Sequence, residues 1–510
     1  MNQSSEITGR GQFIVNLVGG RVNSVTKVAQ MARAFERPAV QYILLVMIVL
    51  TAGTLRFYKL GAWGFWLDEI YTVRNAEALS ALDMTPYIWD ADQSNFPLSF
   101  MLVRLSSAMF GESEWSARFF FALISVLSIP VFYFLIRAVF NPPVALLSVL
   151  FLAIAPWHIY WSQNARYYAL VFFLSNLSLL LFYLGAEKNK PGYLALSGLC
   201  FGLSVLTHPA AAIITPTFVL YPLILKLLRF NWPPGINLKT VAIFGAVIAV
   251  VVLAYFDPIH VFFDDILRIE TDTGQSLDKV IPSAAGGNPL RFLFGVSFFT
   301  GSYLIGFGLF AMVYLIYHQR SRPALLLGVN ALVPIALLVV VSAFRVTFNR
   351  YVFPILLSWH ILSAAGLAAL WKLTKAPEKL LVSGLIVVFL LIPTSENFLY
   401  FRYQNGNREN WRDAFAYVNQ HRQPDDLVVA SFPAAGEYYL GPDVLWSVEV
   451  QPDDIENSGH RVWFVLNNAI EWGVPLHSWI KDNAQNVADF DVVVNSARTY
   501  NMHVYLYTPE

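Results

Sequence analysis

Long apolar runs recur along the first 400 residues and predict an α-helical membrane protein. A helix needs about 20 consecutive apolar residues to cross the hydrocarbon core of a bilayer. Eleven stretches meet or approach that length, near residues 39–58, 117–140, 143–160, 167–186, 192–207, 210–229, 239–256, 292–317, 323–343, 351–372 and 379–398. A shorter apolar run near 97–110 begins at a proline and has charged flanks, so we expect a re-entrant or interfacial helix there.

The pattern changes after residue 400, where Asn, Asp, Arg and Gln become frequent and no run is long enough to span a membrane. The apolar spacing there predicts a small soluble α/β domain, of a usual size for a domain. Its expected helices are 411–421 and 476–482, and its expected strands are 427–430, 462–466, 491–494 and 503–507. We expect a polar segment at 1–38, a transmembrane domain at 39–398 with long loops at 59–116 and 257–291, and the soluble domain at 399–510.

The composition agrees with a membrane protein and excludes several other classes. Hydrophobic residues make up 56% of the chain and charged residues 13%, whereas soluble proteins carry about 25% charged residues. This excludes an ordinary soluble enzyme and a disordered protein. Lys plus Arg and Asp plus Glu each number 34, so no overall basic field favours nucleic acid. The single cysteine, Cys200, has no partner for a disulfide.

The charges of the loops predict the orientation in the membrane. Lys and Arg gather in the short cytoplasmic loops of membrane proteins. If residues 1–38 are cytoplasmic, every turn on that side carries Lys or Arg, while the loops at 59–116 and 257–291 are rich in Asp and Glu. We therefore expect a cytoplasmic N-terminus and an extracytoplasmic C-terminal domain, in the plasma membrane of a bacterium.

The most distinctive polar pair is Asp68-Glu69, which follows Trp63 and Trp66 just after the first predicted span. Charge near a membrane is costly unless it is solvated or used. A carboxylate here could take a proton from an acceptor hydroxyl or amine that attacks an electrophilic carbon. The alternative is that both acids are solvated or cap a helix that begins near Ile70. The local pattern favours neither alternative.

Three further polar residues fall on the same predicted side of the membrane. Asp92 and Asn95 precede the short apolar run and are candidates to line a substrate cavity. Without other context they indicate only a loop and a helix start. Arg118 precedes the second span, where a phosphate contact and a helix-end anchor both account for it.

Two arginines on this side have aromatic neighbours, since Tyr167 follows Arg166 and Tyr351 follows Arg350. Arginine beside tyrosine suits a phosphate oxygen, but aromatic belts and snorkelling arginines are common at membrane interfaces. His208 is another cavity candidate, although a lone His more often has a structural role. No cluster of His, Cys and acids has the spacing of a metal site, so neither a metal nor another cofactor is indicated.

Four motifs in order resemble those of the GT-C-fold integral membrane glycosyltransferases related to protein O-mannosyltransferases and lipid A aminoarabinose transferases. They are Phe65–Glu69 with the acidic pair, Ser113–Arg118 before the second span, Ser162–Tyr168 after the third, and Arg350–Pro354. The resemblance covers nearly all of the chain. One departure is Asn95–Ser99, which lacks the basic residue and the Tyr that lie close to the lipid phosphate in relatives.

The resemblance implies transfer of a sugar from a polyprenyl-phosphate-linked donor to a glycan, lipid or protein acceptor at the extracytoplasmic face. Asp68 would act as general base or orient the acceptor, with Glu69 in a supporting role. Arg166 and Arg350, with the tyrosines beside them, would bind the donor phosphate and stabilise the leaving group. A single displacement with inversion is expected, because the sequence indicates no second nucleophilic carboxylate.

Two other functions fit a polytopic protein. A transporter or flippase of a lipid-linked saccharide also needs phosphate contacts, but secondary transporters commonly show internal pseudo-symmetry and broken helices, and the sequence shows neither clearly. A non-catalytic scaffold of the cell envelope is the third hypothesis. The loop at 257–291 is longer than a connection needs, and we expect it to form a mobile lid that orders when donor binds.

Overall fold

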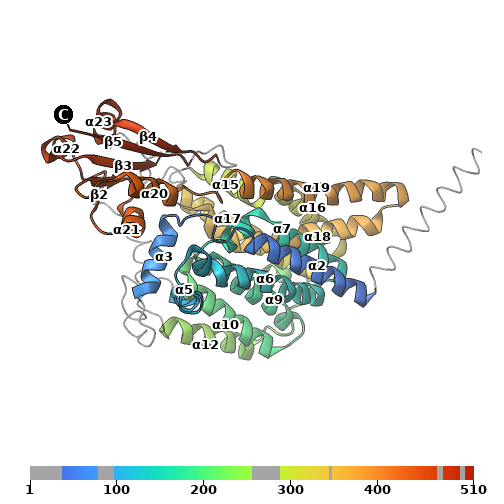
Figure 1. Cartoon of the computed structure of the whole chain (residues 1–510). Helices are drawn as coiled ribbons and strands as arrows, with labels where there is room; N and C mark the ends of the chain where they lie inside the picture. Colours follow the sequence, from blue (N-terminus) through green and yellow to red (C-terminus); the bar gives the residue numbers. More distant parts are fainter. Residues whose placement is uncertain are drawn as a thin grey trace, which may run out of the picture.

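The structure is a computed structural model of the 510-residue chain, and it describes residues 37–78, 97–254, 288–343, 347–467, 475–493 and 500–509. It consists of a helical bundle with a small mixed sheet packed at one end (Figure 1). Asp92, Asn95, almost all of the predicted segment 1–38 and almost all of the predicted lid lie outside the described residues.

The bundle contains long helices and several short ones. In chain order they are α2 (Pro38–Phe57), α3 (Leu67–Ala78), α5 (Pro97–Phe110), α6 (Glu114–Val139), α7 (Pro142–Ile154), α8 (Pro156–Ser162), α9 (Tyr168–Glu187), α10 (Pro191–Thr207), η1 (Pro209–Ile214), α11 (Thr215–Leu227), α12 (Leu238–Ala254), α15 (Pro289–Thr300), α16 (Ser302–Gln319), α17 (Arg322–Ser342), η2 (Asn349–Ile355), α18 (Leu356–Leu373) and α19 (Ala376–Arg402). By length and composition, 8 of the described helices can cross a membrane, or 9 if the bent pair α7 and α8 is one span. Each of the eleven predicted spans coincides with a helix of the bundle or with a consecutive pair, and the predicted short helix is α5. Two of the predicted spans, 192–207 and 239–256, coincide with the shorter apolar helices α10 and α12, which are not among the 8 or 9.

Two predicted spans are broken rather than continuous. Helix α8 begins at Pro156 and meets α7 at a bend of 60°, because proline lacks the N–H that would continue the helical hydrogen bonds. Gly301 separates α15 from α16 and has a φ of 98°, a conformation that glycine adopts without a steric penalty. The broken helices that secondary transporters commonly show are therefore present here as well.

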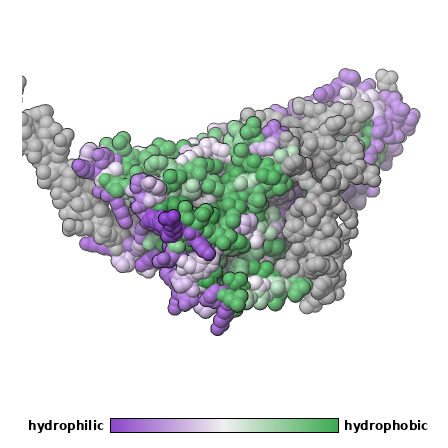
Figure 2. Space-filling model, turned by 180° about the vertical axis from the view of Figure 1, so that it is seen from behind, coloured by the Kyte–Doolittle hydropathy of each residue, from purple (hydrophilic) through white to green (hydrophobic). Residues whose placement is uncertain are grey.

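The outer surface of the bundle is apolar. Helices α9 and α18 are buried along most of their length. By contrast, α2, α16 and α19 expose large apolar side chains such as Leu50, Phe310 and Leu391. Figure 2 shows this hydrophobic belt, with hydrophilic side chains more frequent toward the ends of the molecule. An apolar surface of this extent needs lipid around it, so the chain is a multi-pass membrane protein.

The C-terminal unit, residues 403–509, contains a five-stranded sheet in the order β2-β1-β3-β5-β4. Its elements are α20 (Trp411–His421), β1 (Leu427–Ala430), α21 (Pro433–Leu440), β2 (Val444–Trp446), α22 (Pro452–Ser458), β3 (Val462–Asn467), α23 (Pro475–Asn483), β4 (Gln485–Phe490) and β5 (Met502–Tyr507). Strand β1 is parallel to β2 and β3, and β5 is antiparallel to β3 and β4. The predicted class, a polytopic α-helical membrane protein with a small C-terminal α/β unit, is confirmed.

The strand predicted at 491–494 is wrong for its described residues 491–493, because the strand in this region is β4 and ends at Phe490; Val494 lies outside the described residues. Pairing with β5 decides its position: Gln485 lies opposite Leu506 and Phe490 opposite Met502. The apolar run that suggested a strand follows this ladder. The sequence interpretation also misses β2, α21 and α22, which are short elements whose positions depend on packing against β1 and β3.

The C-terminal unit packs against α3 and the segment Leu60–Trp66 that leads into it. Phe65 shares a hydrophobic cluster with Trp411 and Phe415 of α20. Its backbone N–H donates a hydrogen bond to the Tyr439 hydroxyl at 2.7 Å. The first loop of the bundle and the C-terminal unit therefore form one packed region.

Candidate active site

The predicted acidic pair lies in the first turn of α3. Successive residues of an α-helix are rotated by about 100° about its axis, so the two carboxylates face different surroundings. The side chain of Asp68 is 24% exposed and that of Glu69 is fully buried. Each carboxylate has two arginine partners.

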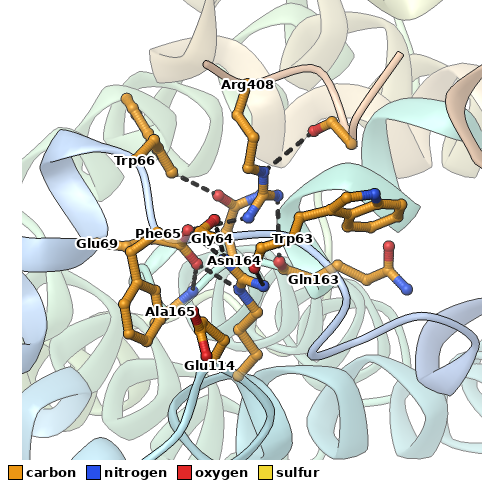
Figure 3. Close-up of polar contacts among 12 residues, drawn as sticks. Trp63, Gly64, Phe65, Trp66, Glu69, Glu114, Gln163, Asn164, Ala165 and Arg408 are labelled. Carbon is orange, nitrogen blue, oxygen red and sulfur yellow. Dashed lines mark hydrogen bonds and ion pairs between the residues drawn. The ribbon is translucent and has the colours of Figure 1, made fainter. Parts of the chain in front are cut away.

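Glu69 is held by four hydrogen bonds (Figure 3). Arg118 donates from Nε to Oε1 at 2.8 Å and from Nη2 to Oε2 at 2.7 Å. Arg408 donates from Nη1 to Oε2 at 2.9 Å, and the Ala165 N–H donates to Oε1 at 2.7 Å. Burial raises the pKa of Glu69, but the two arginines outweigh burial and hold this pKa below its usual value. A carboxylate has about four acceptor sites, so Glu69 has none left for a substrate proton.

Arg118 is fully buried and uses all five of its N–H donors inside the protein. Besides its two bonds to Glu69, it donates at 2.9 Å to the carbonyl oxygens of Leu60, Trp63 and Gly64. No donor of a guanidinium is then left for a ligand. The structure thus gives Arg118 an anchoring position at the entry to α3 and not the predicted contact with phosphate.

Asp68 has looser partners than Glu69. Its Oδ2 lies 3.2 Å from Nη1 of Arg350 and 3.5 Å from Nη2 of Arg166. Charge-assisted hydrogen bonds between nitrogen and carboxylate oxygen usually measure about 2.7–2.9 Å. Both arginines therefore keep capacity for another anion. Of the two acids, only Asp68 is accessible to a substrate.

The two arginines reach Asp68 from different parts of the bundle. Arg166 lies between α8 and α9, and its Nη1 also donates to the Asp68 carbonyl at 3.2 Å and to the Thr72 hydroxyl at 3.0 Å. Arg350 lies in η2, and its buried Nε has no hydrogen-bond partner within the part of the chain that the structure describes. An arginine with an unused donor beside a loosely held carboxylate is well suited to bind an anion.

Three other predicted candidates, Tyr167, His208 and Tyr351, stack beside these arginines. The rings of Tyr167 and His208 are 4.0 Å apart and within 10° of parallel, and Tyr351 lies 6.1 Å from His208. Nδ1 of His208 accepts a hydrogen bond from the Ala210 N–H at 3.1 Å. Burial, together with the two arginines, lowers the pKa of His208 well below its usual value. His208 is therefore neutral and forms part of an aromatic wall.

The site carries an excess of positive charge. Four arginines pair with the carboxylates of Asp68 and Glu69, which leaves two positive charges in excess among these six side chains; the carboxyl group of Glu409 also lies near Asp68. Such charges attract an anion strongly where the surroundings are partly shielded from water. Among the described residues, no three His, Cys, Asp or Glu side chains gather as a metal site would require. The arrangement is suited to bind an anionic group next to a carboxylate that can accept a proton.

Comparisons with known sequences match part of the chain. A family described as dolichyl-phosphate-mannose-protein mannosyltransferase matches residues 92–256. An uncharacterized protein of Aquifex aeolicus is 29% identical over 185 residues, which cover 34% of this chain. The chain spans only about a third of that relative, 36% of its length.

Solved structures match nearly the whole chain. ArnT from Cupriavidus metallidurans bound to undecaprenyl phosphate has a TM-score of 0.55 at 16% identity, with 92% of this chain and 98% of that chain covered. Archaeal oligosaccharyltransferase AglB from Archaeoglobus fulgidus, in complex with an inhibitory peptide and a dolichol-phosphate, has a TM-score of 0.57 at 13% identity, with 90% and 74% covered. The chain has the GT-C fold. The fold implied by the four motifs is thereby confirmed.

Sequence reasoning missed two residues of this GT-C protein, Arg408 and Glu409, in the connection between α19 and α20. Arg408 contacts Glu69. Burial raises the pKa of Glu409, and the nearby charge of Asp68 adds to this effect, while a hydrogen bond with the Asn467 side chain acts in the opposite direction. The available signal was a polar run just after the last apolar span, which also describes the start of any soluble domain.

Proposed function

We propose that this GT-C protein is a glycosyltransferase that moves a sugar from a polyprenyl-phosphate-linked donor to an acceptor. The observation that carries the proposal is the loose pairing of the accessible Asp68 carboxylate with Arg166 and Arg350, at 3.5 and 3.2 Å. The carboxylate is suited to accept a proton and the arginines are suited to bind a phosphate. The lipid phosphates bound by ArnT and AglB support the same class of donor.

Asp68 is the general base in this proposal. The acceptor oxygen or nitrogen attacks the anomeric carbon while its proton passes to the Asp68 carboxylate. A new bond forms from the acceptor atom to the anomeric carbon, and the bond from that carbon to the phosphate oxygen breaks. The electron pair of the broken bond stays on the oxygen, which leaves as polyprenyl phosphate. Arg166 and Arg350 stabilise the charge that develops there.

Donor binding also activates the base. The phosphate and Asp68 compete for the same two guanidinium groups, so each bond that the phosphate makes weakens an ion pair of Asp68. The Asp68 carboxylate that is released from these ion pairs can then contact the acceptor. We therefore expect the donor to bind before the acceptor is deprotonated.

The displacement inverts the anomeric carbon. Retention by double displacement needs a second carboxylate as nucleophile, and the four hydrogen bonds of Glu69 leave it unsuited to that role. Glu69 and Arg118 instead hold the first turn of α3 and thereby position Asp68. The aromatic wall of Tyr167, His208 and Tyr351 covers one side of the donor site.

The charge distribution supports an extracytoplasmic site. The acidic pair and the C-terminal unit lie at the same end of the bundle (Figure 1), and loop charge assigns residues 1–38 to the cytoplasmic side. We propose a plasma-membrane enzyme that acts at its outer face on a glycan, lipid or protein acceptor.

The test is turnover by purified protein in nanodiscs with a panel of polyprenyl-phosphate sugars and candidate acceptors. Release of free polyprenyl phosphate is measured for wild type, for Asp68→Asn and for Glu77→Gln, which changes an exposed acid of the same helix. We expect Asp68→Asn to lose about 10²–10⁴-fold in kcat, the usual contribution of a general base, and Glu77→Gln to resemble wild type.

Two outcomes would contradict the proposal. One is turnover that does not depend on Asp68. The other is saturable donor binding without turnover, together with donor transfer between the leaflets of a vesicle, which would identify a transporter or flippase.

A further inference from the structure

Arg408 belongs to the connection between α19 and α20, yet its side chain is buried at the centre of the site (Figure 3). Its Nη1 donates to Glu69 Oε2 at 2.9 Å, its Nε to the Gly406 carbonyl at 3.2 Å and its Nη2 to the Gln163 carbonyl at 3.4 Å. The guanidinium carbon lies 5.7 Å from the centroid of the Trp63 ring. One side chain thus joins α3, the connection from α8 to α9 and the C-terminal unit.

The backbone that carries Arg408 is strained. Asn405, Gly406 and Asn407 have φ values of 44°, 61° and 54°, so three successive residues lie in the left-handed region that non-glycine residues rarely adopt. A Cβ on Gly406 would lie 2.6 Å from Cε3 of Trp63. Strain of this kind persists only where the surroundings enforce it, and it clusters at functional sites.

Arg408 is not needed to neutralise Glu69, because Arg118 already supplies a bidentate ion pair. The bond from Arg408 instead adds a second constraint on the Glu69 carboxylate. This constraint comes from the connection between α19 and α20, whereas the bonds of Arg118 come from α6. Connections between helices usually run over the surface. The connection between α19 and α20 instead carries a buried arginine, Arg408, that bonds to Glu69, the residue next to Asp68. The position of the C-terminal unit and the geometry of the acidic pair are therefore linked.

We propose that Arg408 is a positioning residue, through which the C-terminal unit fixes Glu69 and, with it, the carboxylate of Asp68. The effect of Arg408 on kcat rests on the proposed function. Arg408 itself does not contact the reacting groups. It keeps Asp68 in reach of the acceptor proton, so its loss lowers kcat and leaves the apparent affinity for donor nearly unchanged.

The kinetic test compares Arg408→Met with Arg412→Met in nanodiscs. Arg412 also joins the C-terminal unit to the entry of α3, since it bonds to Glu114 at 3.4 Å and donates to the carbonyl groups of Gly61 and Ala62, but no bond joins it to Glu69 in the part of the chain that the structure describes. We expect Arg408→Met to lower kcat about 100-fold, as displacement of a reacting group by about 1 Å can do, with donor KM within threefold. We expect Arg412→Met to keep most of the activity.

Chemical rescue separates positioning from a merely structural role. In Arg408→Ala, added guanidinium should restore part of kcat in a saturable way, and it should restore nothing in Asp68→Asn. If Arg408→Met fails to fold, Arg408→Lys takes its place, since it keeps the charge but not the three directed bonds. An Arg408 variant with the kcat of Arg412→Met, or without rescue, overturns the proposal.

A second measurement is independent of turnover. The thermal midpoints of Arg408→Met, Glu69→Gln and the double variant are compared, and we expect the two single shifts not to add. Additive shifts would contradict the coupling of Arg408 to Glu69. If wild type has no activity with any donor but the shifts do not add, the proposed function fails while the positioning of Glu69 by Arg408 stands.

Discussion

Asp68 and Glu69 are neighbours in sequence, but their carboxylates have opposite environments. Asp68 is partly exposed and lies 3.2 and 3.5 Å from its two arginines. Glu69 is fully buried, and its bonds to two other arginines measure 2.7–2.9 Å. One helical turn therefore holds a carboxylate that is accessible and loosely paired beside a carboxylate that is buried and fully bonded. The roles proposed for the two acids, proton acceptor for Asp68 and support for Glu69, rest on this difference.

The first prediction concerns the donor phosphate. Arg350→Met should raise donor KM and lower kcat/KM about 10–100-fold, because a hydrogen bond to a charged group contributes about 1.5–3 kcal/mol. Inhibition by added polyprenyl phosphate should weaken in parallel. The matched control is Arg320→Met, at the opposite end of the bundle, where Arg320 packs over Phe230. Unchanged KM and inhibition in Arg350→Met would remove Arg350 from the donor site.

The second prediction concerns the anchor at the entry to α3. Arg118→Met leaves the carbonyl groups of Leu60, Trp63 and Gly64 without their donor and removes one partner of Glu69. Loss of one partner of a buried ion pair typically costs about 3–5 kcal/mol, so we expect a large drop in thermal midpoint.

Arg118→Lys should fall between Arg118→Met and wild type, since an ammonium has three donors and a guanidinium has five. Arg137→Met provides the control, because Arg137 lies at the other end of α6 and makes a long bond of 3.4 Å to Tyr42. Equal midpoints for Arg118→Met and Arg137→Met would show that the buried pair is not structural.

The acidic pair could be predicted from the sequence, whereas the contacts of Arg118 and Arg408 with Glu69 could not, and the reason is physical. The acidic pair and the spans depend on neighbours along the chain, which hydrophobic length and local motifs report. The partners of Glu69 lie 49 and 339 positions away in sequence, and no local pattern carries that information. For Arg118 the local pattern therefore fitted a phosphate contact and a helix-end anchor alike, and Arg408 was missed altogether.

The breaks in the helices and the short strands of the fold also lack a local pattern in the sequence. Apolar length locates the spans, but a sum of hydrophobicity does not respond to one residue that breaks a helix, such as Pro156 or Gly301. Short edge elements such as β2 carry too few residues for a periodic pattern, and they form because β1 offers a free edge.

The third prediction is a dependence of stability on pH. Burial raises the pKa of Glu69, but Arg118 and Arg408 together hold it below its usual 4.5. As pH falls, the unfolded chain binds this proton before the folded protein does. The contribution of Glu69 to stability is thus complete above its usual pKa and is lost as pH falls through the lower folded value.

Thermal midpoints measured between pH 7 and about pH 3.5 test this loss of stability. The range is chosen because it crosses the usual glutamate pKa of about 4.5. The difference between wild type and Glu69→Gln should be largest at neutral pH and should shrink in acid. Asp453→Asn, which changes an exposed acid of α22, should follow wild type throughout. A difference that stays constant with pH would mean that the ionised form of Glu69 is not the one that stabilises the fold.

The last prediction concerns the strained turn before Arg408. Gly406→Ala places a methyl group in the left-handed region, where non-glycine residues cost of order 1–3 kcal/mol, and brings it within 2.6 Å of the Trp63 ring. Gly459→Ala is the matched control, because Gly459 has a similar φ of 64° but nothing within 4 Å of the added Cβ. Both variants should lower the thermal midpoint, and Gly406→Ala should lower it more. Only Gly406→Ala should also lower kcat, since Trp63 and Arg408 move together with the entry to α3. If Gly406→Ala and Gly459→Ala changed the thermal midpoint and kcat equally, the turn at Gly406 would contribute only its backbone conformation. It would then not position the acidic pair.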